Sequence, residues 1–252
     1  MACERCDDTG WKAVTTDGVR RVVRCDCWRE GVTTRLLDEA RIPPRYRGCD
    51  LETFVIYPNE KLATAVKRAQ RFADDFPGGE QARKGLCLIG PPGIGKTHLA
   101  VAVLRELVAE KGAAGLFYDY CDLLRAIQAT WDRDSEVSQA EVLSPVKEVE
   151  ILLLDDLGAM RPTLWVQEML FHILNARYND EKTTILTSNH LETAAAPGAS
   201  AGRAKDLQEA SLEYQIGVRL RSRLYEMCQT VEMVVSHDYR KKVKQANYSF
   251  GR

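Results

Sequence analysis

The chain has 252 residues, of which 45% are hydrophobic and 28% are charged, which is typical of one sizeable α/β domain with a small appendage. Its 35 Lys and Arg against 36 Asp and Glu exclude a globally basic nucleic-acid-binding protein, so any such contact must use a local patch. No apolar run is long enough to cross a bilayer and the start, MACER, is no secretory signal, so we expect a cytoplasmic protein without membrane contacts.

The N-terminal end is rich in cysteine. Four of the eight cysteines form one C-x-x-C and one C-x-C pair within the first 27 residues: Cys3, Cys6, Cys25 and Cys27. Residues 11–23 alternate in places around Asp17-Gly18, which predicts a hairpin that carries the second pair. Because two such pairs can surround Zn²⁺ and so short a module needs a metal to fold, we predict a structural zinc site. A redox dithiol and incidental cysteines are the alternatives.

A connector follows the cysteine module. Residues 33–40 have helical spacing, and Pro43-Pro44 ends that helix. The basic and aromatic residues after it, including Arg45 and Tyr46, are compatible with a solvated connector surface. Residues 58–76 form an amphipathic pattern that predicts a helix, which Pro77-Gly78-Gly79 terminates.

The central motif of the chain is a phosphate-binding loop. An apolar run over residues 86–89 leads into a match to G-x-x-x-x-G-K-[ST], and a helical segment over residues 98–111 follows. Glycines let backbone N–H groups point at phosphate oxygens, and the next helix directs its positive end at the same anion. Strand, loop and helix all agree, which disfavours a plain Gly/Pro turn. We therefore predict a nucleoside-triphosphate site at Gly90, Pro91, Pro92, Gly93, Ile94, Gly95, Lys96, Thr97 and His98.

Strands and helices alternate beyond the loop. We expect strands over residues 116–118, 149–154 and 183–187, and helices over 122–130 and 163–179. The polar stretch 131–139 and the Ala/Gly-rich stretch 194–204 are expected to be loops. This alternation predicts a doubly wound parallel sheet with helices on both faces, which binds ligands at the carboxyl ends of its strands.

Two carboxylates follow the second of these strands. Asp155 and Asp156 come about 60 residues after the loop, where phosphate-loop enzymes place a magnesium-holding carboxylate. We expect Asp155 to hold Mg²⁺ together with Thr97, and Asp156 to polarise the attacking water. Asn189, after the next strand, can orient the same water. The alternatives are helix-capping carboxylates at a strand end and a turn-forming asparagine.

The C-terminal part is basic. Helical spacing over residues 216–225 puts Arg219 and Arg223 on one face, where they form either solvated salt bridges or an arginine finger toward a neighbouring subunit's γ-phosphate. Which of Arg219, Arg221 and Arg223 crosses an interface stays open. Eight Lys and Arg against three Asp and Glu from Arg219 to the end make this segment the candidate contact for single-stranded DNA.

These residues form a series of motifs in a fixed order: CERC…CDC, IPPRYRGCDLETF, GPPGIGKTHLA, ILLLDDLG, TTILTSNH, IGVRLRSRL and SHDYRKK. Together they resemble the bacterial helicase loaders of the DnaC/DnaI type, which are AAA+ ATPases, and more broadly the IstB-like transposition ATPases. The resemblance covers nearly the whole chain. It implies ATP·Mg²⁺ on Lys96 and Thr97, Asn189 as sensor 1, Arg223 with Arg219 as the arginine finger, and Arg240 as a sensor 2 candidate.

The resemblance also implies an organisation. A zinc module (1–31) would grip the replicative helicase, a connector (32–57) would follow, and an AAA+ domain (58–252) would form nucleotide-dependent homo-oligomers on single-stranded DNA. About sixteen residues separate Arg223 from Arg240, which is too little for the helical lid of most AAA+ proteins. Asp156 stands where many relatives have Glu, so we expect slow hydrolysis that DNA or a partner stimulates.

The sequence leaves three alternative functions open. The chain loads a ring helicase at replication start or restart, or delivers a transposase to target DNA as IstB-like helpers do, or acts as an adaptor that binds ATP as a switch and barely hydrolyses it. The cysteine module favours the first, because it resembles a helicase-docking head.

Overall fold

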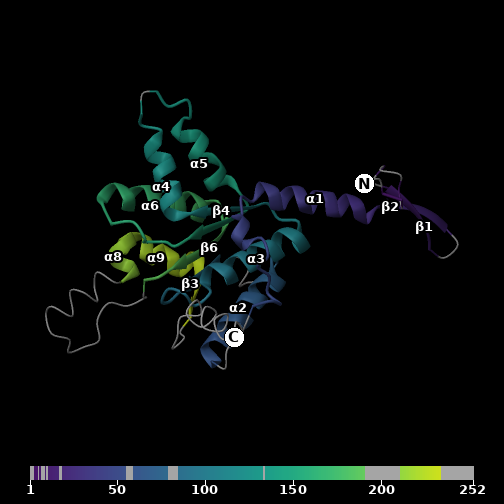
Figure 1. Ribbon diagram of the computed structural model, residues 1–252, viewed down its shortest axis with the longest axis horizontal. Helices are drawn as coiled ribbons and strands as arrows, with labels where there is room; N and C mark the ends of the chain where they lie inside the picture. The colour runs from purple at the N-terminus through teal and green to yellow at the C-terminus, as the bar shows by residue number, and fades with distance from the viewer. Residues whose placement is uncertain are drawn as a thin grey trace, which may run out of the picture.

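The structure is a computed structural model that describes residues 3, 4, 6, 9, 11–16, 19–54, 59–78, 85–132, 134–190 and 211–233. These residues form a small N-terminal hairpin and a larger α/β body (Figure 1). Arg240, the basic segment around it and the Ala/Gly-rich stretch 194–204 lie outside the described residues.

The body is built on one parallel sheet. Its strand order is β4-β5-β6-β3-β7, and every pair of neighbouring strands is parallel. The strands are β3 (Gly85–Ile89), β4 (Gly115–Asp119), β5 (Ile151–Asp155), β6 (Thr183–Ser188) and β7 (Cys228–Glu232). The predicted parallel sheet is therefore confirmed, and all the carboxyl ends of its strands meet at one edge.

Helices cover both faces of this sheet, as predicted. One core contains Leu86 and Leu88 of β3, and the other contains the alternating residues Cys87 and Ile89. Helices on the first face are α1 (Asp26–Glu39), α2 (Glu60–Asp75) and α3 (Lys96–Lys111). Those on the second are α4 (Tyr120–Ala129), α5 (Gln139–Glu148), α6 (Leu164–Asn179), α8 (Leu212–Ile216) and α9 (Val218–Met227). Burial on both faces explains why the strands are continuous apolar runs.

Two helices differ from the sequence-based expectation. Helix α1 begins at Asp26 rather than near residue 33. The predicted helix is shorter because, among the described side chains of α1, the hydrophobic ones that pack on the core are Leu36 and Leu37, near its C-terminal end. Helix α5 lies in a stretch for which the sequence analysis makes no prediction, and it continues through Pro145. A capping box between Ser138 and Glu141, an S-x-x-E sequence, is the signal that could have found it.

The N-terminal module stands away from the body at the far end of α1 (Figure 1). Strands β1 (Trp11–Thr16) and β2 (Val19–Arg24) form the predicted antiparallel hairpin, in which Trp11 pairs with Arg24. Helix α1 starts directly after this hairpin and runs without a break into the body. The expected domain boundary at 31/32 falls inside α1, and the division into domains stays a prediction.

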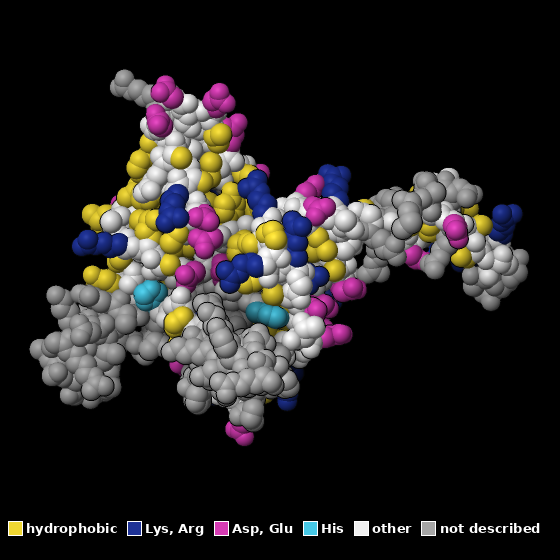
Figure 2. All heavy atoms as spheres, in the orientation of Figure 1, with side chains coloured by type: hydrophobic (Ala, Val, Ile, Leu, Met, Phe, Trp, Pro, Cys, Tyr) yellow, Lys and Arg dark blue, Asp and Glu magenta, His cyan; other side chains and the backbone are white. Residues whose placement is uncertain are grey.

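The described chain ends at Met233, directly after β7, and no helical lid occurs among the described residues. None of the described helices is both long and apolar enough to cross a lipid bilayer. Charged side chains of both signs are interspersed over the described surface in the view of Figure 2, with no basic patch on that face.

Candidate nucleotide-binding site and cysteine cluster

The phosphate loop joins β3 to α3 at the carboxyl edge of the sheet. Gly95 has φ +93° and caps α3, which begins at Lys96, and Gly90 has φ +145°. A side chain at Gly90 would place its Cβ 2.1 Å from the carbonyl oxygen of Met233, so only glycine fits there. Ile94 packs into the core below the loop, so it can contribute only its backbone to a ligand. The loop thus presents the N-terminus of α3 to the pocket above it.

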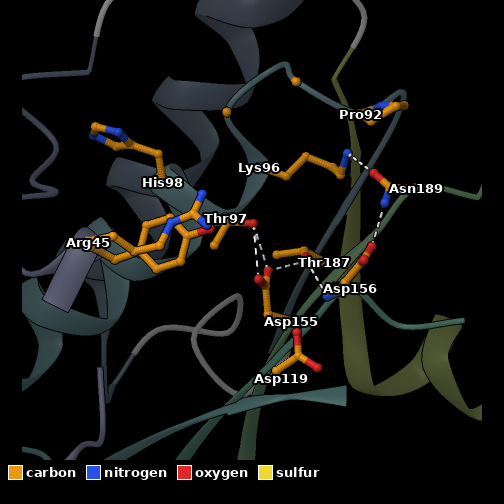
Figure 3. Close-up of a pocket in the computed structure, with 13 residues that line it drawn as sticks. Arg45, Pro92, Lys96, Thr97, His98, Asp119, Asp155, Asp156, Thr187 and Asn189 are labelled. Atoms are coloured by element: carbon orange, nitrogen blue, oxygen red, sulfur yellow. Dashed lines mark hydrogen bonds between the residues drawn. The ribbon is translucent and has the colours of Figure 1, made fainter. Parts of the chain in front are cut away.

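Lys96 ties this loop to the end of β6. Its ammonium donates to the carbonyl oxygens of Gly90 and Pro91, each at 2.8 Å, and to Oδ1 of Asn189 at 2.7 Å (Figure 3). The side chain is 6% exposed, so its charge lies in a partly desolvated site. These three acceptors use all three N–H donors of the ammonium, so a phosphate bound beside the loop would replace one or more of them.

Thr97 and Asp155, the pair expected to hold Mg²⁺, are in direct contact. The Thr97 hydroxyl donates to both carboxylate oxygens of Asp155, at 2.9 and 3.1 Å, and the Thr187 hydroxyl donates to Oδ1 at 2.6 Å. Burial raises the pKa of Asp155, while the hydrogen bonds from Thr187 and Thr97 act in the opposite direction. Carboxylate and hydroxyl oxygens are ligands that Mg²⁺ prefers, so this pair fits a magnesium ion. The charge of that ion would favour the ionised form of Asp155.

Asp156 adopts an unusual backbone conformation. Its φ is +59°, in the left-handed region that aspartate tolerates better than most residues. Its backbone N–H donates to the Thr187 hydroxyl at 2.8 Å, and its carboxylate accepts a hydrogen bond from Nδ2 of Asn189. Asn189 therefore bridges Lys96 and Asp156. In the sequence, Asp156 and Asn189 are linked only because each directly follows a strand of the sheet.

These side chains line one pocket of about 400 Å³. Pro92, Gly93, Gly95, Lys96, Thr97 and His98 form the loop side, and Asp155, Asp156 and Asn189 the opposite side. Four further lining residues are additions to the sequence-based site: Arg45, Tyr46, Asp119 and Thr187. Asp119 ends β4, so the strand-end rule could have found it, and Thr187 lies in β6 two residues before Asn189.

The expected solvated connector surface holds for Arg45, which is exposed, and in part for Tyr46, which is half-buried, but the position of both adds a contact with the nucleotide pocket. Both residues belong to a short 3₁₀ helix, η1 (Pro44–Tyr46), and both line the nucleotide pocket. Both residues belong to the IPPRYRGCDLETF motif, but that motif does not indicate a contact with the phosphate loop, which follows about 50 residues later.

The candidate finger arginines lie elsewhere. Arg219 and Arg223 share one face of α9 and stack on aromatic rings of α6: each guanidinium carbon lies near Phe171, at 4.7 and 5.6 Å from the ring centroid. Arg223 also lies 4.7 Å from the ring of Tyr178, whereas Arg221 is 2% exposed. None of the three lines the pocket of its own chain.

The four N-terminal cysteines converge. Their sulfur atoms lie within 4.8 Å of one another, with 3.9 Å between Cys3 and Cys25 and 3.3 Å between Cys6 and Cys27. Zn–S bonds of about 2.3 Å give S···S edges of roughly 3.8 Å in a tetrahedron, which falls in this range, whereas a disulfide needs about 2.05 Å. The hydrogen bond with Cys6, and to a lesser degree burial, raise the pKa of the Cys27 thiol. Four thiolates this close together would repel one another unless a cation lay between them. The cluster fits zinc.

Comparison with known proteins agrees with this geometry. Residues 80–199 match the family described as IstB-like ATP binding protein. The crystal structure of the DnaC helicase loader is 31% identical, with a TM-score of 0.62, and the alignment covers 76% of this chain and all of that chain. The chain belongs to the IstB/DnaC family.

Other relatives of this IstB/DnaC-family chain show more distant similarity. Phage-like element PBSX protein XkdC of Bacillus subtilis is 26% identical over 92% of this chain and 82% of its own length. Replicative helicase loader DnaC of Escherichia coli K12 is 24% identical over 63% of this chain, and this chain spans 62% of that loader. The family members are P-loop AAA+ proteins, which agrees with the five-stranded parallel sheet and the loop at its edge.

Proposed function

We propose that this chain is an ATP-dependent loader that places a replicative helicase of the DnaB type onto single-stranded DNA at the start or restart of replication. The observation that carries the proposal is the pairing of an ATP-type site in the body with a cysteine cluster held away from it by α1 (Figure 1). The similarity to DnaC helicase loaders supports it.

ATP binding and hydrolysis follow from the pocket. The N–H groups of the loop and the Lys96 ammonium would bind the β- and γ-phosphates, and Thr97 with Asp155 would hold Mg²⁺, which neutralises the phosphate charge. The Asp156 carboxylate would accept the proton of the attacking water, with Asn189 holding that carboxylate in place. Since Asp is one methylene shorter than Glu, we expect slow hydrolysis that DNA or the helicase stimulates.

A complete site would require a second copy of the chain. Arg219 and Arg223 lie outside their own pocket but stand together on α9, partly exposed on the aromatic rings of α6. An arginine placed this way can reach the γ-phosphate of a neighbouring subunit and contribute on the order of 10³–10⁵ in rate. The proposal therefore includes a nucleotide-dependent homo-oligomer, on which the basic C-terminal segment would contact single-stranded DNA.

The cysteine cluster would provide the docking head. Cys25 caps α1 and Cys27 lies in its first turn, so metal binding would fix the hairpin to the helix. A salt bridge of 2.6 Å between Lys12 and Asp26 joins the same two elements. We propose that this zinc-built head grips the helicase and takes no part in the chemistry.

A second candidate function is an IstB-like helper that delivers a transposase to target DNA. The match of residues 80–199 to the IstB-like ATP binding protein family favours it, because that match includes most of the pocket. Both candidates share the ATP site, so the partner distinguishes them.

The test is a capture experiment with the intact protein as bait, against the replicative helicase of its host and any transposase encoded beside it, with and without a zinc chelator. Helicase capture that is lost on chelation supports the loader with a metal-built head. Transposase capture without helicase capture would instead establish the IstB-like helper.

A further inference from the structure

The connector that leads from α1 to the body is fastened to the ATPase on both sides of Arg45. Before it, the carbonyl oxygen of Ala40 accepts a hydrogen bond from the Phe117 N–H of β4 at 2.8 Å. After it, the Arg105 guanidinium of α3 donates to the carbonyl oxygen of Cys49. These contacts hold η1 against the carboxyl edge of the sheet, so its position is set by the body.

The same connector also touches the phosphate loop. A side chain at Gly95 would place its Cβ 3.1 Å from Cε2 of Phe54, so the Phe54 ring packs directly on the loop backbone. The Phe54 ring also makes an edge contact with His98, with 5.3 Å between centroids and 83° between planes. A rearrangement of the loop would therefore move the connector.

Arg45 extends from this connector into the nucleotide pocket. Figure 3 shows its side chain directed toward Thr97, and its guanidinium carbon lies 4.5 Å from the ring centroid of Tyr46. Among the described residues, no carboxylate pairs with this guanidinium. The stacked ring holds the arginine in the pocket wall while its hydrogen-bond donors stay available.

The excess of negative charge in the pocket favours a phosphate-binding role for Arg45. Apart from Arg45, the described lining carries three carboxylates, of Asp119, Asp155 and Asp156, against one cation, Lys96. A polyphosphate bound there needs more positive charge than Lys96 and one Mg²⁺ supply beside three carboxylates. A guanidinium suits this purpose, because its fork of N–H donors matches phosphate oxygens.

We propose that Arg45 binds the phosphates of the nucleotide, so that the conformation of the connector depends on whether nucleotide occupies the pocket. This inference rests on the proposed ATP site. Arg45 follows the end of α1 by six residues, and the 14 residues of α1 span about 21 Å to the cysteine cluster. Nucleotide binding would therefore reach the docking head through one short, fastened segment.

The first test measures the affinity of Mg²⁺·ATPγS by calorimetry in wild type, Arg45→Ala, Arg45→Lys and Arg47→Ala. Arg47 is the matched control, because it is an exposed arginine two residues further on that does not line the pocket. Arg45→Ala should weaken binding roughly 10- to 100-fold, the loss of one charge-assisted contact, and Arg45→Lys should weaken it less. Arg47→Ala should stay within about twofold.

The second test uses hydrogen exchange to separate phosphate sensing from a merely structural role. The N–H groups of Tyr46, Arg47 and Cys49 bond within the connector turn, at 2.8, 3.3 and 3.0 Å. ATPγS should slow their exchange in wild type and in Arg47→Ala but not in Arg45→Ala. Equal affinity and equal protection in Arg45→Ala and wild type would overturn the inference. Absence of ATPγS binding in wild type would instead overturn the proposed ATP site.

Discussion

The Thr187 hydroxyl links two of the three acidic residues of the pocket, Asp155 and Asp156, and Thr187→Val replaces that hydroxyl with a methyl group of similar size. The hydroxyl donates to Oδ1 of Asp155 at 2.6 Å and accepts from the Asp156 N–H at 2.8 Å. Thr187 is 1% exposed, so water cannot easily replace either bond. The substitution therefore leaves a buried carboxylate with one donor fewer and a backbone N–H without its acceptor.

The magnitude follows from these two bonds. A hydrogen bond to a charged group is worth about 1.5–3 kcal/mol, and an unsatisfied buried donor costs about 1–3 kcal/mol. We expect Thr187→Val to lower the free energy of unfolding by about 3 kcal/mol, or the melting temperature by roughly 6–12 °C. Loss of the Thr187 donor should also raise the pKa of Asp155 further, because that bond favours the ionised form, and so weaken magnesium-dependent nucleotide binding.

Urea unfolding followed by circular dichroism, with calorimetric titration of Mg²⁺·ATPγS, measures both effects. Thr187→Ser is the matched control, because it keeps the hydroxyl and loses one buried methyl group worth about 1 kcal/mol. Equal unfolding free energies for the Val and Ser variants would refute the reasoning, since the hydroxyl would then contribute nothing.

Three further predictions concern other sites. Asp156→Asn should keep ATP binding within about threefold and lower single-turnover hydrolysis at least 100-fold, the typical contribution of a general base; unchanged hydrolysis would remove Asp156 from that role. Cys27→Ser should lower the zinc content measured by atomic absorption and abolish helicase capture, whereas Cys121→Ser, at a half-buried cysteine outside the cluster, should change neither. Arg177 is 0% exposed and donates to the carbonyl oxygens of Val146 and Val149 at 3.0 and 2.8 Å. Arg177→Ala should therefore lower the free energy of unfolding, measured in urea, by about 3–5 kcal/mol. A loss smaller than that of a surface Arg→Ala variant would contradict this account.

Arg177 also shows how a buried cation is tolerated with no carboxylate among its hydrogen-bond acceptors in the described part of the chain. Burial lowers its pKa to about 10, which still leaves the guanidinium charged at neutral pH. Its donors bond to carbonyl oxygens at the end of α5 and around the start of β6, so the charge meets the negative end of a helix. The sequence pattern of α6 indicates only that a polar residue interrupts its buried face.

Local sequence determined those elements whose functional residues are neighbours in the chain. The phosphate loop combines glycines, a lysine and a threonine in one stretch, so its geometry follows from a few neighbouring residues. The parallel sheet follows from apolar runs that alternate with helical segments, and the carboxyl-edge rule then places Asp155 and Asn189 near the loop. The hairpin and the cysteine pairs follow in the same way from their spacing.

Tertiary structure alone decided the contacts between distant segments. The shared hydrogen bonds of Thr187, and the entry of Arg45 into the pocket, depend on how strands and the connector pack, and no local pattern encodes them. Among the described side chains, the N-terminal half of α1 contributes none to the core, so periodicity could not reveal that one helix joins the cysteine cluster to the ATPase body. Sequence specifies chemistry where the reacting groups are neighbours in the chain, and packing specifies it where they meet only in the fold.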